Sequence, residues 1–214
     1  MEKNSEISSA IEEVSMMVIV KPGGNHETAH IPTKPFLSLC YLVLQVLDKI
    51  GPAMAVLRQD VHQNIKRLES MHETNSSMNS NLVEILKSEA SKGNMGKRCS
   101  CSKAFVWLTR SLDFTAALLH RLAKDPIKNM EQVVEESYAS TLAPFHGWIS
   151  SAAFHVALKL VPDSKTFMDL LREKDENYDT LKDKMQIMVS LLVPFLEDIH
   201  CIIEAYNLDR FKST

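Results

Sequence analysis

Apolar residues recur along most of this chain at the spacing that gives a helix one buried face. The first clear stretch lies between Pro35 and Gly51, where apolar side chains stand three and four positions apart. These positions are Phe36, Leu39, Cys40, Val43, Val46 and Leu47. The Gly51-Pro52 pair stops the pattern, because both residues disfavour a continuing helix. The spacing therefore predicts a first core helix that ends before Gly51.

The same spacing continues over the rest of the chain. Further helices are predicted at residues 53–71, 82–90, 105–122, 130–142, 144–160, 167–172 and 177–208. Proline suits a first helical turn, so Pro144 is expected to open one helix, whereas Pro194 lies deep inside the last helix and is expected to kink it. No segment shows the alternation of a strand. The chain is therefore predicted to be all-α, with about eight helices.

The N-terminal residues differ from the rest of the chain. A short amphipathic stretch from Ile7 to Val20 runs into Lys21-Pro22-Gly23-Gly24, a sequence that breaks helices. We expect residues 1–30 to form a flexible N-terminal extension and residues 31–214 to form one domain. A chain of 214 residues is long enough to bury a single sizeable core.

Composition and charge exclude several classes of protein. The chain has 24 Lys and Arg against 27 Asp and Glu, so it lacks the excess of positive charge that binds nucleic acid. Its uninterrupted apolar runs are far shorter than the roughly 18 to 20 residues of a membrane span. The N-terminus is acidic and polar, unlike a secretory signal, and four cysteines are too few for a disulfide scaffold. We expect a cytoplasmic protein.

The sequence offers little that resembles an enzyme or a metal centre. His120 and Asp125 have the spacing of an acyltransferase pair, but the histidine falls in the last turn of a helix, where a cation complements the helix dipole. Cys99 and Cys101 lack the second pair that a structural zinc site needs. Phosphate-binding loops and nucleophile elbows are absent. We therefore expect no catalysis, no metal and no cofactor.

A row of polar residues on the second helix is a candidate binding surface. Asp60, Asn64 and Arg67 stand four and three positions apart, so they form one stripe about 10 Å long. That length fits a sugar-sized headgroup. An ordinary solvated helix face has the same spacing, so the pattern alone leaves both interpretations open.

Two further positions offer binding chemistry. Lys103 and Trp107 stand one helical turn apart, which places a cation beside an indole whose face can stack on a sugar ring. His146 lies near a predicted helix start, where its ring can bind a buried ligand. A core tryptophan and a structural histidine are the alternatives.

Taken together and in this order, these groups resemble the glycolipid transfer protein family. The matching motifs are Asp60-x3-Asn64-x2-Arg67, Trp107-Leu108-x-Arg110 and Phe145-His146-Gly147-Trp148. Supporting matches are Pro35-Phe36-Leu37, Leu47-Asp48-x-Ile50-Gly51, Phe154-x2-Ala157-Leu158-x2-Val161-Pro162 and Phe211-Lys212. The likeness covers about residues 33–212.

The resemblance implies a two-layer sandwich of helices that holds one sphingolipid, with the headgroup at the surface and the chains between the layers. Asp60 would bind sugar hydroxyls and the ceramide amide N–H. Asn64 and Arg67 would hold other hydroxyls, and Trp107 would lie under the sugar ring. His146 would donate to the ceramide amide carbonyl.

The resemblance also implies which residues meet the lipid chains and the bilayer. Leu47, Phe154 and Leu158 would line the tunnel for the chains. Trp148 would touch the membrane, with Tyr138 nearby in the same role. The protein would thus contact a glycosphingolipid and, transiently, a membrane surface.

Two positions indicate the kind of cargo. In the family's ceramide-1-phosphate branch, lysine and arginine stand where this chain has Asn64 and Trp107, so the neutral amide and the aromatic ring here suit an uncharged sugar. Lys103 departs from the glycolipid branch, which has an apolar residue there, and suggests tolerance of an anionic sugar headgroup. Arg67 and Phe211 also depart, since they replace a lysine and a tyrosine.

The resemblance therefore predicts a monomeric carrier that extracts a glucosylceramide-like glycosylceramide from one membrane and delivers it to another. A lipid sensor or adaptor that uses the same pocket is one alternative. A carrier of an anionic sphingolipid such as ceramide-1-phosphate is another. An enzyme acting on lipid would rest on His120 and Asp125 alone.

Overall fold

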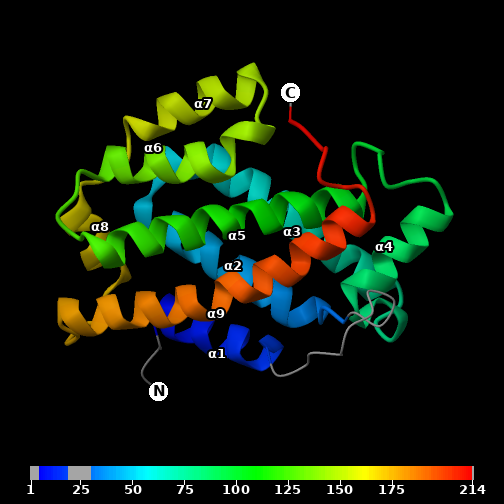
Figure 1. Ribbon diagram of the computed structural model, residues 1–214, viewed down its shortest axis with the longest axis horizontal. Coiled ribbons are helices and arrows are strands. Elements are labelled where there is room, and N and C mark those ends of the chain that lie inside the picture. The colour runs from blue at the N-terminus through cyan, green and yellow to red at the C-terminus, as the bar shows by residue number, and fades with distance from the viewer. Residues whose placement is uncertain (1–4, 19–29, 214) are drawn as a thin grey trace.

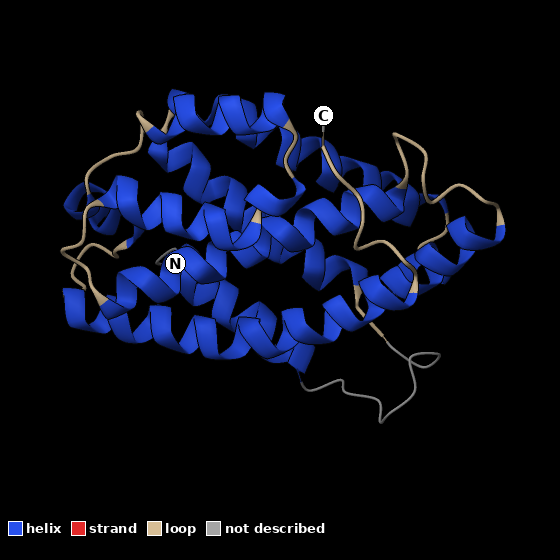
Figure 2. Ribbon diagram, turned by 45° about the horizontal axis from the view of Figure 1, so that its top comes forward, coloured by secondary structure: helices blue, strands red, loops and turns tan. Residues whose placement is uncertain are grey.

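The computed structural model describes residues 5–18 and 30–213, and nine α-helices account for most of them (Figures 1 and 2). They are α1 (Glu6–Val18), α2 (Thr33–Ile50), α3 (Ala55–Thr74), α4 (Leu82–Ser91), α5 (Cys101–Lys124), α6 (Met130–Thr141), α7 (Trp148–Leu158), α8 (Ser164–Leu171) and α9 (Tyr178–Ala205). Short 3-10 helices stand at Pro52–Met54, Met78–Ser80 and Ala143–Phe145. No β-strand occurs in the described ranges, so the predicted all-α class is confirmed.

α5 lies at the centre of the molecule. It packs against α3, α6 and α9, while α2 packs against α3, and α1 bridges α2 and α9. In Figure 1, α5 and α9 lie nearer to the viewer than α2 and α3, which form the layer behind them. The layers meet in one apolar core, where the rings of Phe36 on α2 and Phe105 on α5 lie 5.4 Å apart.

Local polar contacts fix the start of α5. The Ser100 hydroxyl accepts a hydrogen bond from the backbone N–H of Lys103 at 3.1 Å and so caps the helix. The buried Glu89 carboxylate of α4 accepts from the N–H groups of Cys101 at 2.7 Å and Ser102 at 2.8 Å. Its negative charge also complements the dipole of α5. These contacts hold the beginning of α5 against α4.

The expectation of a flexible N-terminal extension is wrong for residues 6–18. They form α1, whose apolar face is buried against α2 and α9. Its start is tied to Glu173, whose carboxylate accepts hydrogen bonds from the Ser5 N–H at 3.2 Å and the Ser8 hydroxyl at 3.1 Å. The helix joins the core because its apolar face packs against α9, which lies far along the chain. Residues 19–29 lie outside the described residues.

The predicted helix over residues 144–160 is interrupted. A 3-10 turn ends at Phe145, and α7 begins only at Trp148. His146 and Gly147 between them have extended backbone, with ψ of 133° and −179°. Because His146 stands outside any helix, its side chain turns back toward α5 and α6 rather than following the face of α7.

α9 is the one helix of the described residues that is long and apolar enough to cross a membrane, by length and composition alone. Core helices pass the same test, and α9 packs along α5 and α1. Pro194 lies inside it, yet the helix runs unbroken from Tyr178 to Ala205. The apolar composition of α9 is therefore accounted for by its place in the core.

The burial of α1 predicts a stability effect. Val14 is fully buried, whereas Met16 on the same helix is 58% exposed. Val14→Ala should lower the free energy of unfolding by about 1–3 kcal/mol, because burial is lost and a cavity is left. Met16→Ala, the matched control, should change it by less than about 0.5 kcal/mol. Denaturant melts measure both, and equally small effects would show that α1 adds nothing to the core.

A histidine–carboxylate pair joins α5 to α9. The Nε2 atom of His200 lies 3.0 Å and 2.9 Å from the two carboxylate oxygens of Asp113. This hydrogen bond raises the pKa of His200, although burial and the charge of Arg110 act against it. The protonated pair therefore stabilises the contact between the two helices.

This pair predicts a pH dependence of stability. A histidine whose folded pKa is raised contributes stability that is fully present below its unfolded pKa of about 6.5 and is lost as the pH rises through the folded pKa. His200→Gln should therefore lower the free energy of unfolding most near about pH 5.5 and least above about pH 8.5. The pair is partly exposed, so the effect should stay within about 1 kcal/mol. Urea melts across this range measure it, and an effect independent of pH would contradict the assignment.

Candidate functional site

The three polar residues predicted to share a stripe on α3 form a hydrogen-bonded row. The Arg67 guanidinium donates from Nη1 to the Asn64 side-chain oxygen at 3.0 Å, and the Asn64 amide donates to Asp60 Oδ2 at 3.4 Å. Asn64 is buried, whereas Asp60 faces solvent. Desolvation by the surrounding protein raises the pKa of Asp60, and the charge of Arg67 opposes this shift. The row therefore presents acceptors at one end and donors at the other.

Lys103 and Trp107 on α5 have neighbours that the sequence did not indicate. The Lys103 ammonium lies 5.4 Å from the centre of the Phe211 ring, in the C-terminal segment. Trp107 is half-buried, and the Arg110 guanidinium lies 4.8 Å from the centre of its ring. The indole is thus held in place by a cation from the next turn of the same helix.

Arg110 belongs to a matching motif, but its role could not be predicted from the sequence. The buried guanidinium lies 3.5 Å from the centre of the Phe145 ring and donates to the backbone carbonyls of Asp209 at 2.9 Å and Phe211 at 2.7 Å. Burial lowers the pKa of Arg110 to about 10, with Asp113 and Asp209 acting in the other direction, so it stays protonated at neutral pH. Arg110 therefore ties the C-terminal segment to α5 and to the corner between α6 and α7.

His146 is brought to the same place as Trp107. The two ring centres lie 5.6 Å apart, and the hydroxyl oxygen of Tyr138 on α6 lies 3.1 Å from His146 Nδ1. Burial lowers the pKa of His146, and the positive charge of Arg110 lowers it further. The imidazole is therefore neutral at neutral pH and has one nitrogen free of the Tyr138 contact.

The expectation that Tyr138 touches a membrane is wrong. Its side chain is only 5% exposed, because its ring stacks on Phe154 of α7 at 3.5 Å with an angle of 8° between the planes. Its hydroxyl faces His146 and Ser151. Tyr138 is thus a support for the histidine. Trp148, by contrast, is 80% exposed, as a membrane contact requires.

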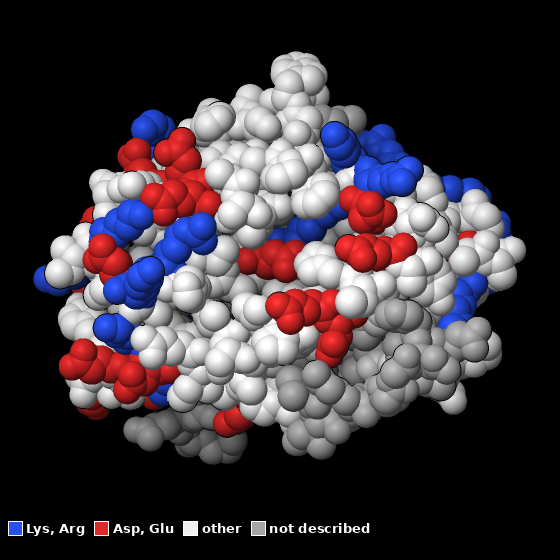
Figure 3. All heavy atoms as spheres, in the orientation of Figure 1, with Lys and Arg blue, Asp and Glu red and all other residues white. Residues whose placement is uncertain are grey.

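Trp148 is part of an apolar surface on α7. Ile149, Val156 and Leu160, just past the end of the helix, are also exposed. Figure 3 shows the top of the molecule, where α7 lies, as a crest without charged residues, and Lys and Arg side chains gather beside it. Exposed apolar patches of this kind mark contacts with other apolar surfaces.

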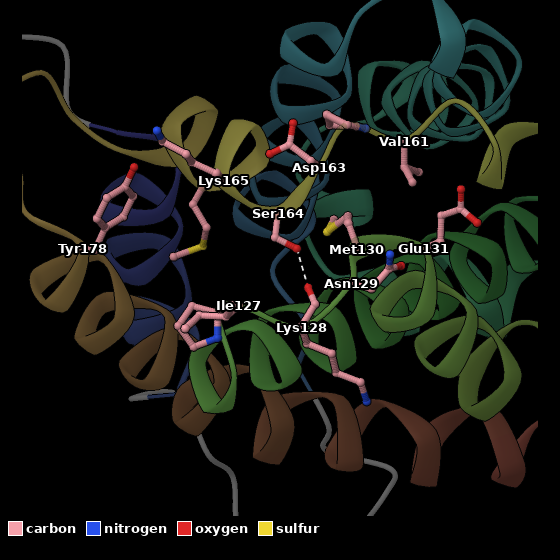
Figure 4. A pocket seen from close by; sticks show the side chains of 13 residues that line it. Ile127, Lys128, Asn129, Met130, Glu131, Val161, Asp163, Ser164, Lys165 and Tyr178 are labelled. Atoms are coloured by element: carbon pink, nitrogen blue, oxygen red, sulfur yellow. Dashed lines mark hydrogen bonds between the residues drawn. The ribbon is translucent and has the colours of Figure 1, made fainter.

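The residues predicted to line a tunnel lie inside the protein. Leu47 of α2 and Leu158 of α7 are buried in the core, and Phe154 is half-buried against Tyr138. A pocket of about 670 Å³ lies elsewhere, between the α5–α6 turn and the start of α8 (Figure 4). Ile127, Lys165 and Tyr178 stand around it. This pocket contains none of the predicted site residues.

The enzyme and metal alternatives gain no support. His120 and Asp125 are both exposed at the end of α5, and Asp125 accepts a hydrogen bond from the Ile127 N–H. Cys99 is exposed while Cys101 is buried. Within the part of the chain that the structure describes, no three His, Cys, Asp or Glu side chains converge as metal ligands.

The comparison with protein families agrees with this arrangement. The model of the family described as glycolipid transfer protein matches residues 31–173. The chain belongs to the glycolipid transfer protein family. Glycolipid transfer protein 2 of Arabidopsis thaliana is 53% identical to it over 211 residues, which cover 99% of this chain and 95% of that protein. Glycolipid transfer proteins are lipid carriers that catalyse no reaction, so this chain is a carrier rather than an enzyme.

Solved structures of the family confirm the two-layer helical fold. The structure of FAPP2, which selects simple glycosphingolipids using this fold, matches with a TM-score of 0.83 at 27% identity. The match covers 99% of this chain and 100% of that one. A mutant of Arabidopsis ACD11 (accelerated-cell-death 11) complexed with C12 ceramide-1-phosphate also has a TM-score of 0.83, at 19% identity, over 98% of this chain and 99% of that one. The glycolipid transfer protein fold is therefore common to both kinds of cargo.

Arg110 yields a prediction for the C-terminal segment. Arg110→Met keeps the length of the side chain but removes the donors to the Asp209 and Phe211 carbonyls. Hydrogen bonds from charged groups contribute about 1.5–3 kcal/mol each, so stability should fall by about 2–4 kcal/mol and carboxypeptidase should remove the C-terminus faster. Arg98→Met, at an exposed position, is the control. Wild-type resistance in Arg110→Met would show that another contact holds the segment.

Proposed function

We propose that this protein extracts a glycosylceramide from one membrane and delivers it to another. The observation that carries the proposal is the hydrogen-bonded row of Asp60, Asn64 and Arg67 on α3, which packs against the helix that carries Trp107. Membership of the glycolipid transfer protein family supports the general activity, and the chemistry of this row supports the particular cargo.

The row suits a sugar because sugar hydroxyls both donate and accept hydrogen bonds. Asp60 offers acceptors, Arg67 offers donors, and Asn64 offers both. Their mutual hydrogen bonds hold the side chains in place before a sugar arrives, which limits the entropy lost on binding. Trp107 contacts Arg110 and His146 but is only half-buried, so its indole would offer a flat surface to the C–H groups of the sugar ring.

The charges of these residues favour a neutral headgroup. Arg67 is linked through Asn64 to the Asp60 carboxylate, so the row carries one positive and one negative charge. Arg110 is already committed to two backbone carbonyls. A phosphate placed here would meet the negative charge of Asp60, and like charges repel. Glucosylceramide therefore fits better than ceramide-1-phosphate.

His146 suits the ceramide amide. It is neutral at neutral pH. The single Tyr138 proton can go either to His146 Nδ1 or to Ser151 Oγ, and in the arrangement in which Tyr138 donates to Nδ1 the imidazole proton resides on Nε2. Nε2 can then donate to the amide carbonyl of the lipid. An amide group left without a partner at the mouth of an apolar site costs about 1–3 kcal/mol, so this contact would set the orientation of the ceramide.

The lipid chains need shelter from water throughout transfer. A two-chain lipid exposes on the order of 30 methylenes, and at about 0.8 kcal/mol each their transfer to water would cost roughly 25 kcal/mol. Leu47, Leu158 and Phe154 would supply apolar surface. Since Leu47 and Leu158 are packed in the core, the layers must part as the chains enter. The apolar face of α7 around Trp148 would rest on the bilayer during this step.

The proposal places the carrier in the cytoplasm as a monomer. All four cysteines are free, which agrees with a compartment that keeps thiols reduced.

A lipid sensor or adaptor would bind the same cargo but move little of it between vesicles. Transfer assays therefore separate a carrier from a sensor.

The first test is transfer of labelled glucosylceramide between vesicles, run beside labelled ceramide-1-phosphate. Wild type should move glucosylceramide much faster. Asp60→Val and Trp107→Ala should each reduce that rate at least about tenfold, which is about 1.4 kcal/mol of lost interaction. Their melting temperatures should stay near wild type, because neither side chain is buried in the core.

Gln63→Ala, at an exposed position of α3 outside the row, is the matched control and should transfer at the wild-type rate. Preferential transfer of ceramide-1-phosphate would show that the headgroup assignment is wrong. Binding of glucosylceramide without transfer would favour the sensor.

Lys103 supports a second candidate cargo, an anionic glycosphingolipid. Its ammonium forms no ion pair among the described residues and lies over the Phe211 ring. On α5, Lys103 stands one helical turn before Trp107. Lys103→Leu should lower transfer of sulfated relative to neutral glycosylceramide by about threefold to tenfold, the effect of about 1 kcal/mol. Lys97→Leu, in the loop before α5, is the control. An unchanged ratio in Lys103→Leu would remove the case for anionic cargo.

A further inference from the structure

A groove distinct from the pocket of Figure 4 lies on the side of α3 that faces away from the Asp60 row. It has a volume of about 380 Å³ and runs between the first half of α2 and the last turns of α3. At 100° per residue, Glu69 points about 180° away from Asp60, and His72 lies about 18 Å further along the helix axis than Asp60. The lining residues are Lys34, Leu37, Ser38, Tyr41, Glu69, His72, Glu73 and Ser76. The groove is therefore separate from the proposed headgroup site.

His72 is the unusual member of this lining. Its side chain is only 7% exposed, and its Nδ1 atom is buried without a hydrogen-bond partner. Leaving such a group unpaired is unfavourable, and native proteins rarely do so without a reason. Leu37, which also lines the groove, is buried as well. His72 thus has an unpaired atom inside the protein, and other atoms of the same side chain line the groove.

The wall beside His72 is an ordered set of polar groups. The Tyr41 hydroxyl donates to one oxygen of Glu69 at 2.7 Å, and the Lys66 ammonium donates to the other at 2.8 Å. Although burial acts in the other direction, these hydrogen bonds hold the pKa of Glu69 below its ordinary value, so it is ionised at neutral pH. Burial and the Glu69 contact raise the pKa of Tyr41, which keeps its proton. Each Glu69 oxygen still has a lone pair for a ligand.

The rim carries balanced charges. Lys34 from α2 and Glu73 from α3 are both exposed, and neither forms an ion pair within the described part of the chain. An anion would meet the carboxylates of Glu69 and Glu73. The described residues also offer no group of three side chains that could hold a metal ion. Ser38, Tyr41 and Ser76 add hydroxyl groups to the lining, so it offers both donors and acceptors.

We propose that this groove binds a small neutral molecule with several hydroxyl groups, with His72 and Glu69 as its main hydrogen-bonding partners. A sugar ring fits this description, either as a free sugar or as the exposed headgroup of a second glycolipid. The volume lies within the range of small-molecule sites, and all lining residues except Leu37 carry hydrogen-bonding groups, which suits a polyol better than a wholly apolar ligand. The site does not depend on which cargo the other face of α3 carries.

The test is a titration of the full chain with D-glucose, followed by the backbone amide NMR signals of Leu37 and Glu73. Both signals should shift and saturate with one common dissociation constant, on the order of millimolar. Octyl glucoside below its micelle concentration reports whether a sugar with an alkyl tail binds equally well. Inorganic phosphate should leave both signals in place.

Two variants test the site by different routes. His72→Phe removes the imidazole, and Ser38→Phe, at a partly exposed position, fills the groove. Each should weaken glucose binding at least about tenfold. Asp60→Val should leave the dissociation constant unchanged, because it alters only the other face of α3. Glucosylceramide transfer by Ser38→Phe should equal that of wild type.

Absence of saturation up to about 0.1 M glucose would overturn the proposal, as would unchanged binding in both groove variants. Loss of binding in Asp60→Val would place the sugar in the headgroup site instead. None of these outcomes depends on transfer, so failure here and failure of the proposed carrier function can be told apart.

Discussion

The proposed site depends on one buried cation. Arg110 packs against Trp107 and Phe145 and donates to the carbonyls of Asp209 and Phe211, so a single side chain joins α5, the corner between α6 and α7, and the C-terminal segment. A buried guanidinium is tolerated only when its donors are satisfied, and here the backbone of a distant segment satisfies them. Ser213 reinforces the arrangement by donating from its N–H to the Phe145 carbonyl at 2.9 Å. The indole and the imidazole can face each other because these three segments are fixed together.

Around this centre, polar and apolar requirements are kept apart by helix geometry. α3 places its hydrogen-bonding row on one face and its core residues, such as Ile65 and Leu68, on another. α7 contributes the ring of Phe154 to the interior and leaves Trp148 outside. A carrier of an amphiphile needs both kinds of surface within a short distance, and amphipathic helices supply them without a long loop.

Features that depend on neighbours within one or two turns could be predicted from the sequence. The helices themselves follow from apolar spacing, and the Asp60 row follows from positions four and three residues apart. Features that depend on distant partners could not. The burial of α1 requires α2 and α9, and the partners of Arg110 lie about a hundred residues away. The burial of Tyr138 depends on the stacked ring of Phe154 on another helix, which the sequence does not reveal.

The break at His146 and Gly147 has a consequence for how cargo and membrane act on each other. Only Gly147 separates His146, held inside by Tyr138, from Trp148, which projects into solvent. Under the proposed function, His146 holds the ceramide and Trp148 touches the bilayer. A displacement of one is passed to the other through a single residue, so the two binding equilibria are linked. Thermodynamic linkage is reciprocal. If the bilayer changes the affinity for cargo by some factor, bound cargo changes the affinity for the bilayer by the same factor. Where the bilayer lowers the affinity for cargo, loading itself weakens binding to the donor membrane, with no other source of energy.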